Sequence, residues 1–255
     1  KDTNVDVLAI GLDGKAKGTP AKAGTRFGYN VFGARLSDNT IVLAKTVPGT
    51  QKNALGDPYT DAWLERVNAA GKELGSAYVS KVLAVVDGRA LAQTQGMGVI
   101  VYADNRSGDN GTYPTREVFA AVLADNGSVL PSAGTLLTAP PRNLISAAAG
   151  AKHALVAWEE GSSGARDVVG VLLDSTGNTL KKVTFGSQSY DESLPQVAFD
   201  GQNFVVSWID RGNGYDSGVF RRMAPDGSFV DPAFVFVAPG KTSSTAISSL
   251  VCNEN

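Results

Sequence analysis

Five turn glycines recur along this chain at a nearly constant interval: Gly14, Gly71, Gly127, Gly177 and Gly227. The intervals are 57, 56, 50 and 50 residues, and each glycine closes a short apolar segment. Internal similarity at a period of about 50 residues indicates an array of repeated supersecondary units. The spacing therefore constrains the architecture of the chain before any motif is considered.

The last unit contains four short apolar runs separated by Gly, Asp, Asn or Pro. The runs cover 195–201, 203–208, 219–223 and 229–237. Each run has the length and the β-branched or aromatic content of a strand. Trp158 and Trp208 lie 50 residues apart in their second runs, and Tyr102 holds the same place one unit earlier. Four strands per unit predict a propeller blade, and we expect Trp158 and Trp208 to pack between blades.

We therefore expect one all-β domain over residues 1–255, a β-propeller of about five four-stranded blades with almost no helix, since no stretch keeps a 3.6-residue periodicity. Strands from both termini would close the ring. The expected units are 1–24, 25–80, 81–140, 141–190 and 191–240, with 241–255 as the closing strand of the first blade.

The first and last segments are out of phase with the repeat. Residues 5–10 match a third strand and residues 245–252 match a first strand, which leaves the shared blade without its second strand. A middle strand cannot be skipped without orphaning the backbone groups of its neighbours. Three explanations stay open: residues assigned to a loop fill the gap, the chain is part of a longer propeller, or a partner chain supplies the strand.

Composition excludes several classes of partner. The net charge of −2 gives no field for nucleic acid or anionic lipid. No segment has the roughly 20 consecutive apolar residues of a membrane span. Cys252 is the only cysteine, so no internal disulfide can form. Cys252 is either a small buried apolar residue or half of a disulfide with a missing segment or a partner chain.

Residues 195–211 read Pro-Gln-Val-Ala-Phe-Asp-Gly-Gln-Asn-Phe-Val-Val-Ser-Trp-Ile-Asp-Arg and are followed by Gly214-Tyr-Asp216 and Asp226-Gly227. This segment resembles the repeat of bacterial secreted or surface-anchored β-propeller proteins. The match is good over 195–232, fair over 97–180 and weak before residue 60. The resemblance implies a propeller fold and an extracellular or cell-surface location, and it implies no single activity.

Clusters of acidic and basic residues follow the second strand of three units: Asp104-Asn-Arg106 with Asp109, Glu159-Glu160 with Arg166-Asp167, and Asp210-Arg211 with Asp216. They could form a ring that binds a polar ligand, or each cluster could hold its own hairpin loop in shape through hydrogen bonds and Asp–Arg pairs. Their recurrence in several units favours the structural role in the loops. Tyrosines in the loops could stack on a sugar. The candidate ligand-binding residues are Asp104, Arg106, Tyr113, Tyr190, Asp210, Arg211 and Tyr215.

The sequence predicts no catalytic residue, metal ligand or cofactor. No Asp-x-Asp-x-Asp-Gly motif is present, and His153, the only histidine, falls in a predicted turn. Asp38, Asp87 and Asp200 are candidates for acids of a glycosidase channel. Asp87 and Asp200 each precede a glycine, which favours a turn role for both.

Three functions follow as hypotheses. The favoured one is an exported, non-enzymatic β-propeller that binds a protein or glycan partner through its loops. The first alternative is a carbohydrate-active hydrolase with acidic residues in the central channel. The second alternative is a structural subunit of a surface assembly, in which a neighbouring chain donates the missing strand.

Overall fold

The computed structural model describes residues 5–10, 16–23, 29–35, 40–52, 58–68, 70–81, 85–94, 97–104, 117–124, 128–138, 145–186, 190–212, 216–237 and 250. These residues form eighteen β-strands and no α-helix. The expectation of an all-β chain with almost no helix is therefore confirmed for the described part.

The strands form one two-stranded sheet and four four-stranded sheets, all antiparallel and each a meander in chain order. The two-stranded sheet contains β1 (Val5–Ile10) and β2 (Ala16–Ala23). The next sheet contains β3 (Tyr29–Arg35), β4 (Ile41–Lys52), β5 (Pro58–Val67) and β6 (Glu73–Ser80). The third contains β7 (Val85–Thr94), β8 (Met97–Asp104), β9 (Glu117–Ala124) and β10 (Val129–Thr138). The fourth contains β11 (Ser146–Ala149), β12 (His153–Ser162), β13 (Ala165–Asp174) and β14 (Thr179–Gly186). The fifth contains β15 (Glu192–Phe199), β16 (Phe204–Asp210), β17 (Ser217–Met223) and β18 (Phe234–Val237).

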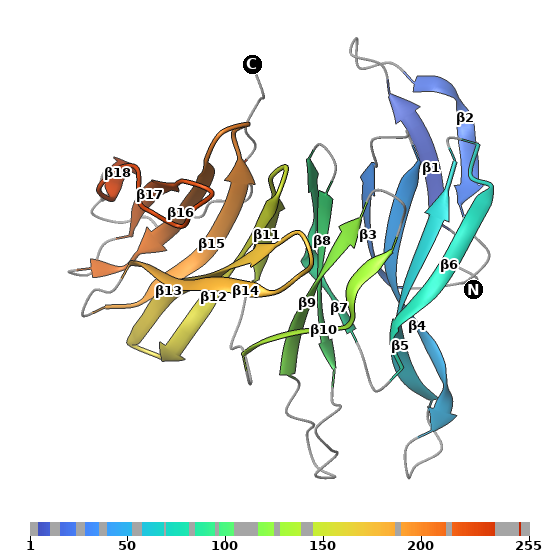
Figure 1. Ribbon diagram of the computed structural model, residues 1–255, viewed down its shortest axis with the longest axis horizontal. Coiled ribbons are helices and arrows are strands. Elements are labelled where there is room, and N and C mark those ends of the chain that lie inside the picture. Colours follow the sequence, from blue (N-terminus) through green and yellow to red (C-terminus); the bar gives the residue numbers. More distant parts are fainter. Residues whose placement is uncertain are drawn as a thin grey trace.

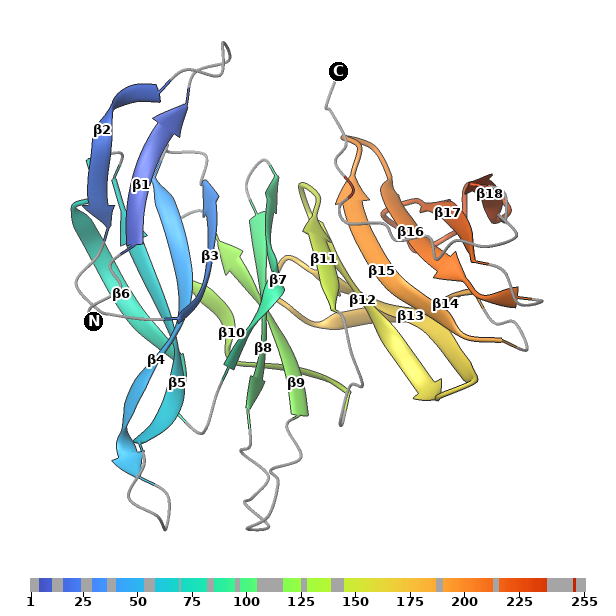
Figure 2. The ribbon, with the colours of Figure 1, turned by 180° about the vertical axis from the view of Figure 1, so that it is seen from behind.

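The sheets stand side by side in an open array (Figures 1 and 2). Their first strands, β3, β7, β11 and β15, are neighbours in this order. The β1–β2 sheet lies at one end of the array and the β15–β18 sheet at the other. The expected closed ring of five complete blades is thus wrong for the described residues, because closure requires the two end sheets to meet. The predicted closing strand over 245–252, including Cys252, lies outside the described residues apart from Leu250.

Apolar side chains from both faces of the inner sheets form the core. Alternation along each strand sends one set of residues to the preceding sheet and the other set to the following sheet. Tyr102, Trp158 and Trp208 are buried, and each belongs to the cluster shared with the preceding sheet. The expectation that Trp158 and Trp208 pack between sheets is confirmed.

Lys45 takes the corresponding place in the β3–β6 sheet. In register, Lys45 pairs with Trp63, as Trp158 pairs with Val169 in its own sheet. The Lys45 side chain is completely buried and forms an ion pair with Glu65, which is also completely buried. The position that holds Tyr102, Trp158 or Trp208 in the other three sheets therefore holds a lysine in the β3–β6 sheet, and this lysine is neutralised by Glu65.

The turn glycines join the third and fourth strands of their sheets, as the repeat predicts. Gly71, Gly177 and Gly227 have φ angles of 76°, 83° and 78°. Each donates its N–H to the carbonyl three residues earlier, at 2.9–3.0 Å. This geometry matches a three-residue hairpin loop, whose last residue needs the left-handed conformation that glycine adopts without strain. Gly14 and Gly127 lie outside the described residues.

The predicted strand over 229–237 is shorter than expected. Phe229 makes only an isolated bridge to Met223, and β18 begins at Phe234. Pro232 cannot donate to a ladder, and the Asp231 carboxylate accepts hydrogen bonds from Arg222. The chain therefore bends away at this point before it rejoins β17.

Candidate functional site

Asp104 ends β8 and is completely buried. Its Oδ2 accepts a hydrogen bond from Ser80 Oγ at 2.7 Å, and Ser80 ends β6 of the preceding sheet. This carboxylate therefore links two sheets and is covered on all sides. The structure separates it from the other described candidates, which lie just before β15 and at the end of β16 in the last sheet.

Glu159, Arg166 and Asp191 form an ionic network between those last two sheets. Arg166 Nη1 lies 2.9 Å from Glu159 Oε2, and Arg166 Nη2 lies 2.8 Å from Asp191 Oδ2. Asp191 Oδ1 also accepts the backbone N–H groups of Gly164 and Arg166, at 2.8 and 3.0 Å. Glu159 Oε1 accepts the N–H of Leu194 at 2.9 Å. These contacts hold the β12–β13 hairpin against the strand that enters the next sheet.

The network also shifts the pKa values of Asp191 and Arg166. The hydrogen bond from Arg166 is the main cause that lowers the pKa of Asp191 to about 2, with support from the two backbone N–H groups. The same hydrogen bond raises the pKa of Arg166 above its ordinary value. Asp191 therefore stays ionised at any physiological pH. The sequence singled out Glu159 and Arg166 but missed Asp191, which follows Arg166 by 25 residues and belongs to the next unit.

Tyr190, Asp210 and Arg211 lie together immediately beyond this network. Arg211 donates its N–H to the Asp191 carbonyl at 3.0 Å and its Nε–H to Ser193 Oγ at 3.0 Å. Asp210 Oδ1 accepts the N–H of Gly212 at 2.9 Å. The Tyr190 ring packs on Gly212, where an added methyl group would stand 3.5 Å from ring atom Cδ2. Tyr190 is 44% exposed and Arg211 is exposed.

The remaining predicted candidates have different outcomes. Arg106, Tyr113 and Tyr215 lie outside the described residues, as do Asp38 and the side chain of Asp87. Asp200 is a turn residue, because its Oδ1 accepts the N–H groups of Gln202 and Asn203 at 2.9 and 2.6 Å. Within the described ranges, no group of three or more His, Cys, Asp or Glu side chains could hold a metal ion.

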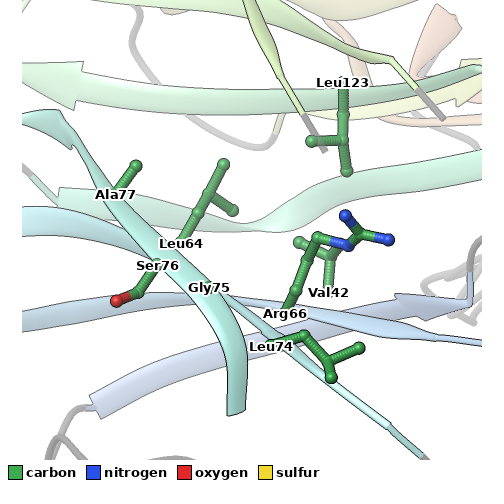
Figure 3. A pocket seen from close by; sticks show the side chains of 8 residues that line it. All are labelled: Val42, Leu64, Arg66, Leu74, Gly75, Ser76, Ala77 and Leu123. Carbon is green, nitrogen blue, oxygen red and sulfur yellow. The ribbon is translucent and has the colours of Figure 1, made fainter. Parts of the chain in front are cut away.

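The described residues line hollows between neighbouring sheets. Figure 3 shows a pocket of about 170 Å³ between β3–β6 and β9, with Val42, Leu64 and Leu123 as apolar walls. Arg66 reaches into this pocket, and its Nη2 lies 3.4 Å from Thr40 Oγ1. A larger cleft of about 320 Å³ lies between the hairpin turns of the last two sheets. Phe199, Phe204 and Lys152 are among the residues that line it, and the sequence predicted none of them as a site residue.

Comparisons with known proteins add little about function. No protein-family model matches the sequence, and no curated protein matches it. Among solved structures, an ulvan lyase described as a polysaccharide lyase is similar at a TM-score of 0.47 and 12% identity, over 83% of this chain and 56% of that chain. A sucrose-6-phosphate hydrolase from Lactobacillus gasseri is similar at 0.37 and 12%, over 78% of this chain and 46% of that one. A glycosyl hydrolase from Bacteroides ovatus is similar at 0.35 and 8%, over 89% and 73%.

This chain thus spans about half the length of the first two of these structures, 56% and 46%. Similarity at such TM-scores and identities carries no argument about the ligand or the activity of this chain. The described residues include no helix that is long and apolar enough to cross a membrane.

Proposed function

We propose that this chain binds a glycan through the surface formed by Tyr190, Asp210 and Arg211. One observation carries the proposal: the exposed Tyr190 ring packs on Gly212, the residue that follows an exposed arginine whose backbone and Nε are already held by other groups. Tyrosine offers an apolar face for a sugar ring and a polar tip for its hydroxyl groups. Arginine offers a planar set of donors that suits hydroxyl or carboxylate oxygens.

The support beneath this surface is rigid. Arg211 is anchored on the Asp191 carbonyl, and Asp191 in turn is fixed by Arg166 and by two backbone N–H groups. A binding site whose side chains are held before the ligand arrives loses less conformational entropy on binding. The ionic network between the sheets thus acts as a platform for the binding surface.

Glycan cleavage is the second candidate, because carboxylates lie next to the same surface. A glycosidase needs one carboxyl group that is protonated near neutral pH and donates to the leaving oxygen. Asp191 has the opposite property, with a pKa of about 2, and both oxygens of Glu159 already accept hydrogen bonds. These two acids favour binding over cleavage, while the hydrolase hypothesis awaits an activity measurement.

The proposal also covers the complete fold of the protein, its location and its assembly. The open array of similar sheets, each starting from a strand beside the first strand of its neighbour, supports assignment of the sheets as blades of a propeller with further strands. An extracellular or cell-surface location is proposed from the resemblance of 195–232 to exported propeller repeats. A role as a structural subunit, with a strand from a neighbouring chain, is tested by the mass of the native particle in solution.

The test is binding of the purified protein to a panel of neutral and acidic polysaccharides. We expect Tyr190→Ala and Arg211→Ala to weaken retention about tenfold each, whereas Tyr190→Phe keeps the ring and retains binding. Lys182→Ala is the control, because Lys182 forms an exposed pair with Glu160 in the preceding sheet. Equal retention of wild type and both alanine variants would contradict the proposal. Release of new chain ends from any bound polysaccharide would favour the hydrolase.

A further inference from the structure

A cleft lies at the opposite end of β15 and β16 from the Tyr190 surface. β15 starts at Glu192, next to the Tyr190 surface, and ends at Phe199. At about 3.3 Å per residue, its eight residues separate the two places by roughly 25 Å. Here two tight hairpin turns stand side by side, closed by hydrogen bonds from Gly150 N to His153 O at 2.8 Å and from Asp200 N to Asn203 O at 3.0 Å. The cleft between these turns has a volume of about 320 Å³.

Aromatic rings form the inner wall of this cleft. Phe199 is half-buried, Phe204 is completely buried, and their ring centroids lie 5.1 Å apart. Gly150 allows the Phe199 ring to approach the backbone of the neighbouring turn. A methyl group at Gly150 would stand 2.9 Å from Phe199 Cε2, closer than carbon atoms approach in folded proteins. The missing side chain at Gly150 therefore lets the Phe199 ring lie against the neighbouring turn, where it lines the cleft.

The rim of the cleft carries cationic and amide groups. Lys152 and Gln202 are exposed and come from the two facing turns, and His153 is half-buried beside Lys152. No described residue that lines the cleft is acidic. The nearest acids in sequence, Asp200 and Asp226, each accept backbone N–H groups of their own turns. Lys152 therefore supplies a positive charge to the rim, and no described lining residue supplies a negative one.

We propose that this cleft binds a six-membered ring that carries a carboxylate. The ring face would lie on Phe199, the carboxylate would pair with Lys152, and Gln202 would donate or accept a hydrogen bond at the far side. A volume of about 320 Å³ falls at the lower end of the range for small-molecule pockets and suits one ring rather than a chain. Two sources share this chemistry, an aromatic acid and a uronic acid residue of a polysaccharide.

Titration with matched pairs of small probes tests the proposal. The acidic probes are benzoate and methyl β-glucuronide, and their neutral counterparts are benzamide and methyl β-glucoside. For fragments of this size we expect dissociation constants on the order of 1 mM, measured by ligand-observed NMR. We expect at least one acidic probe to bind about tenfold more tightly than its neutral counterpart. The tighter acidic probe identifies the source of the natural ligand.

Two variants locate the binding. Lys152→Glu reverses the charge at an exposed turn and should abolish the preference for the acidic probe, while Lys72→Glu makes the same change at a distant exposed turn and should leave it intact. Phe199→Leu keeps an apolar side chain but removes the flat face, and should weaken the bound probe several-fold. The proposal is overturned if neither acidic probe binds, if the neutral probes bind equally well, or if Lys152→Glu binds like the wild type. Because Tyr190 lies at the far end of β15, Tyr190→Ala should leave this binding unchanged, so failure at one surface is distinguishable from failure at the other.

Discussion

The ammonium group of Lys181 donates a hydrogen bond to the carbonyl oxygen of Gly227 at 2.8 Å. Lys181 lies in β14, and Gly227 lies in the turn between β17 and β18 of the next sheet. One sheet earlier, Thr135 Oγ1 in β10 donates to the carbonyl oxygen of Gly177. The fourth strand of each of these sheets thus holds the turn of the sheet that follows. A turn glycine therefore shapes its own hairpin and also joins two sheets.

Replacement of these glycines by alanine should destabilise the protein in a defined order. Gly177→Ala places a methyl group 2.5 Å from the Leu130 carbonyl oxygen and from Pro131 Cδ, in addition to the strain of a positive φ, and we expect a loss of about 3 kcal/mol. At Gly227 the nearest atom is Cδ of the flexible Lys181 side chain, at 2.8 Å, so we expect about 1–2 kcal/mol.

Gly75→Ala is the matched control, because a methyl group there meets nothing within 4 Å, and its effect should stay within about 0.5 kcal/mol. Urea unfolding monitored by tryptophan fluorescence measures all three free energies. A variant at Gly177 as stable as the one at Gly75 would show that the contact between the sheets does not constrain this turn.

Loss of Arg166 should be more severe than loss of an exposed lysine on the same sheet. Arg166→Ala leaves Glu159, which is 2% exposed, without its cation, and we expect the free energy of unfolding to fall by about 2–3 kcal/mol. Arg166→Lys should recover only part of this, since one ammonium group cannot reproduce the contacts of the guanidinium with two carboxylates. Lys182→Ala, at an exposed pair, should change it by less than about 1 kcal/mol. Urea unfolding of the three variants tests this order, and equal effects of Arg166→Ala and Lys182→Ala would contradict it.

The pKa of Asp191 predicts a stability change at acidic pH. Because Arg166 lowers this pKa to about 2 in the folded protein, the ionised form stabilises the fold. That contribution is fully present above the ordinary pKa of about 3.9 and is lost as the pH falls through about 2. We expect about 1–2 kcal/mol of stability to disappear over this window, after allowance for solvent screening. Thermal unfolding of wild type and Asp191→Asn between pH 5 and pH 2 checks the effect, and parallel pH profiles would refute it.

The buried Lys45–Glu65 pair predicts strong coupling between its partners. Lys45→Met removes the ammonium partner of a completely buried carboxylate and should lower the free energy of unfolding by about 3–5 kcal/mol. The double variant Lys45→Met, Glu65→Leu should recover most of that loss, because two apolar side chains need no desolvated charge. A double-mutant cycle from urea unfolding measures the coupling energy. Additive effects of the two single changes would show that the pair is energetically independent.

Local chemistry explains which parts of the fold were predictable. Gly71, Gly177 and Gly227 stand in turns that require a positive φ. Glycine is the residue that adopts this conformation without strain, so these turns can be predicted from the sequence alone. Trp158 and Trp208 stand in continuous apolar runs, which are typical of strands that are buried on both faces, so their burial follows from local sequence.

The expected closed ring is wrong for the described residues, because closure depends on how sheets distant in the sequence are oriented and no local pattern records that orientation. The same limit explains the candidate site. Asp210 and Arg211 were found beside each other in the repeat, and the tertiary fold brings Tyr190 to them from the preceding connection. Asp191 escaped notice because its partner Arg166 belongs to the neighbouring sheet. Lys152 and Phe199 escaped notice because each sits in an ordinary hairpin, and only two hairpins together make the cleft.

By itself, the sequence determined the strands, the turns between them and the residues that point into the interfaces, since these depend on backbone conformation and on burial within a few residues. The tertiary structure alone decided which carboxylate meets Arg166, where Lys181 finds the carbonyl of Gly227, and whether the array closes. Those outcomes depend on contacts between sheets, and the Arg166–Asp191 and Lys181–Gly227 contacts join residues 25 and 46 positions apart. A period of 50 to 57 residues repeats the units but does not specify the angle between them.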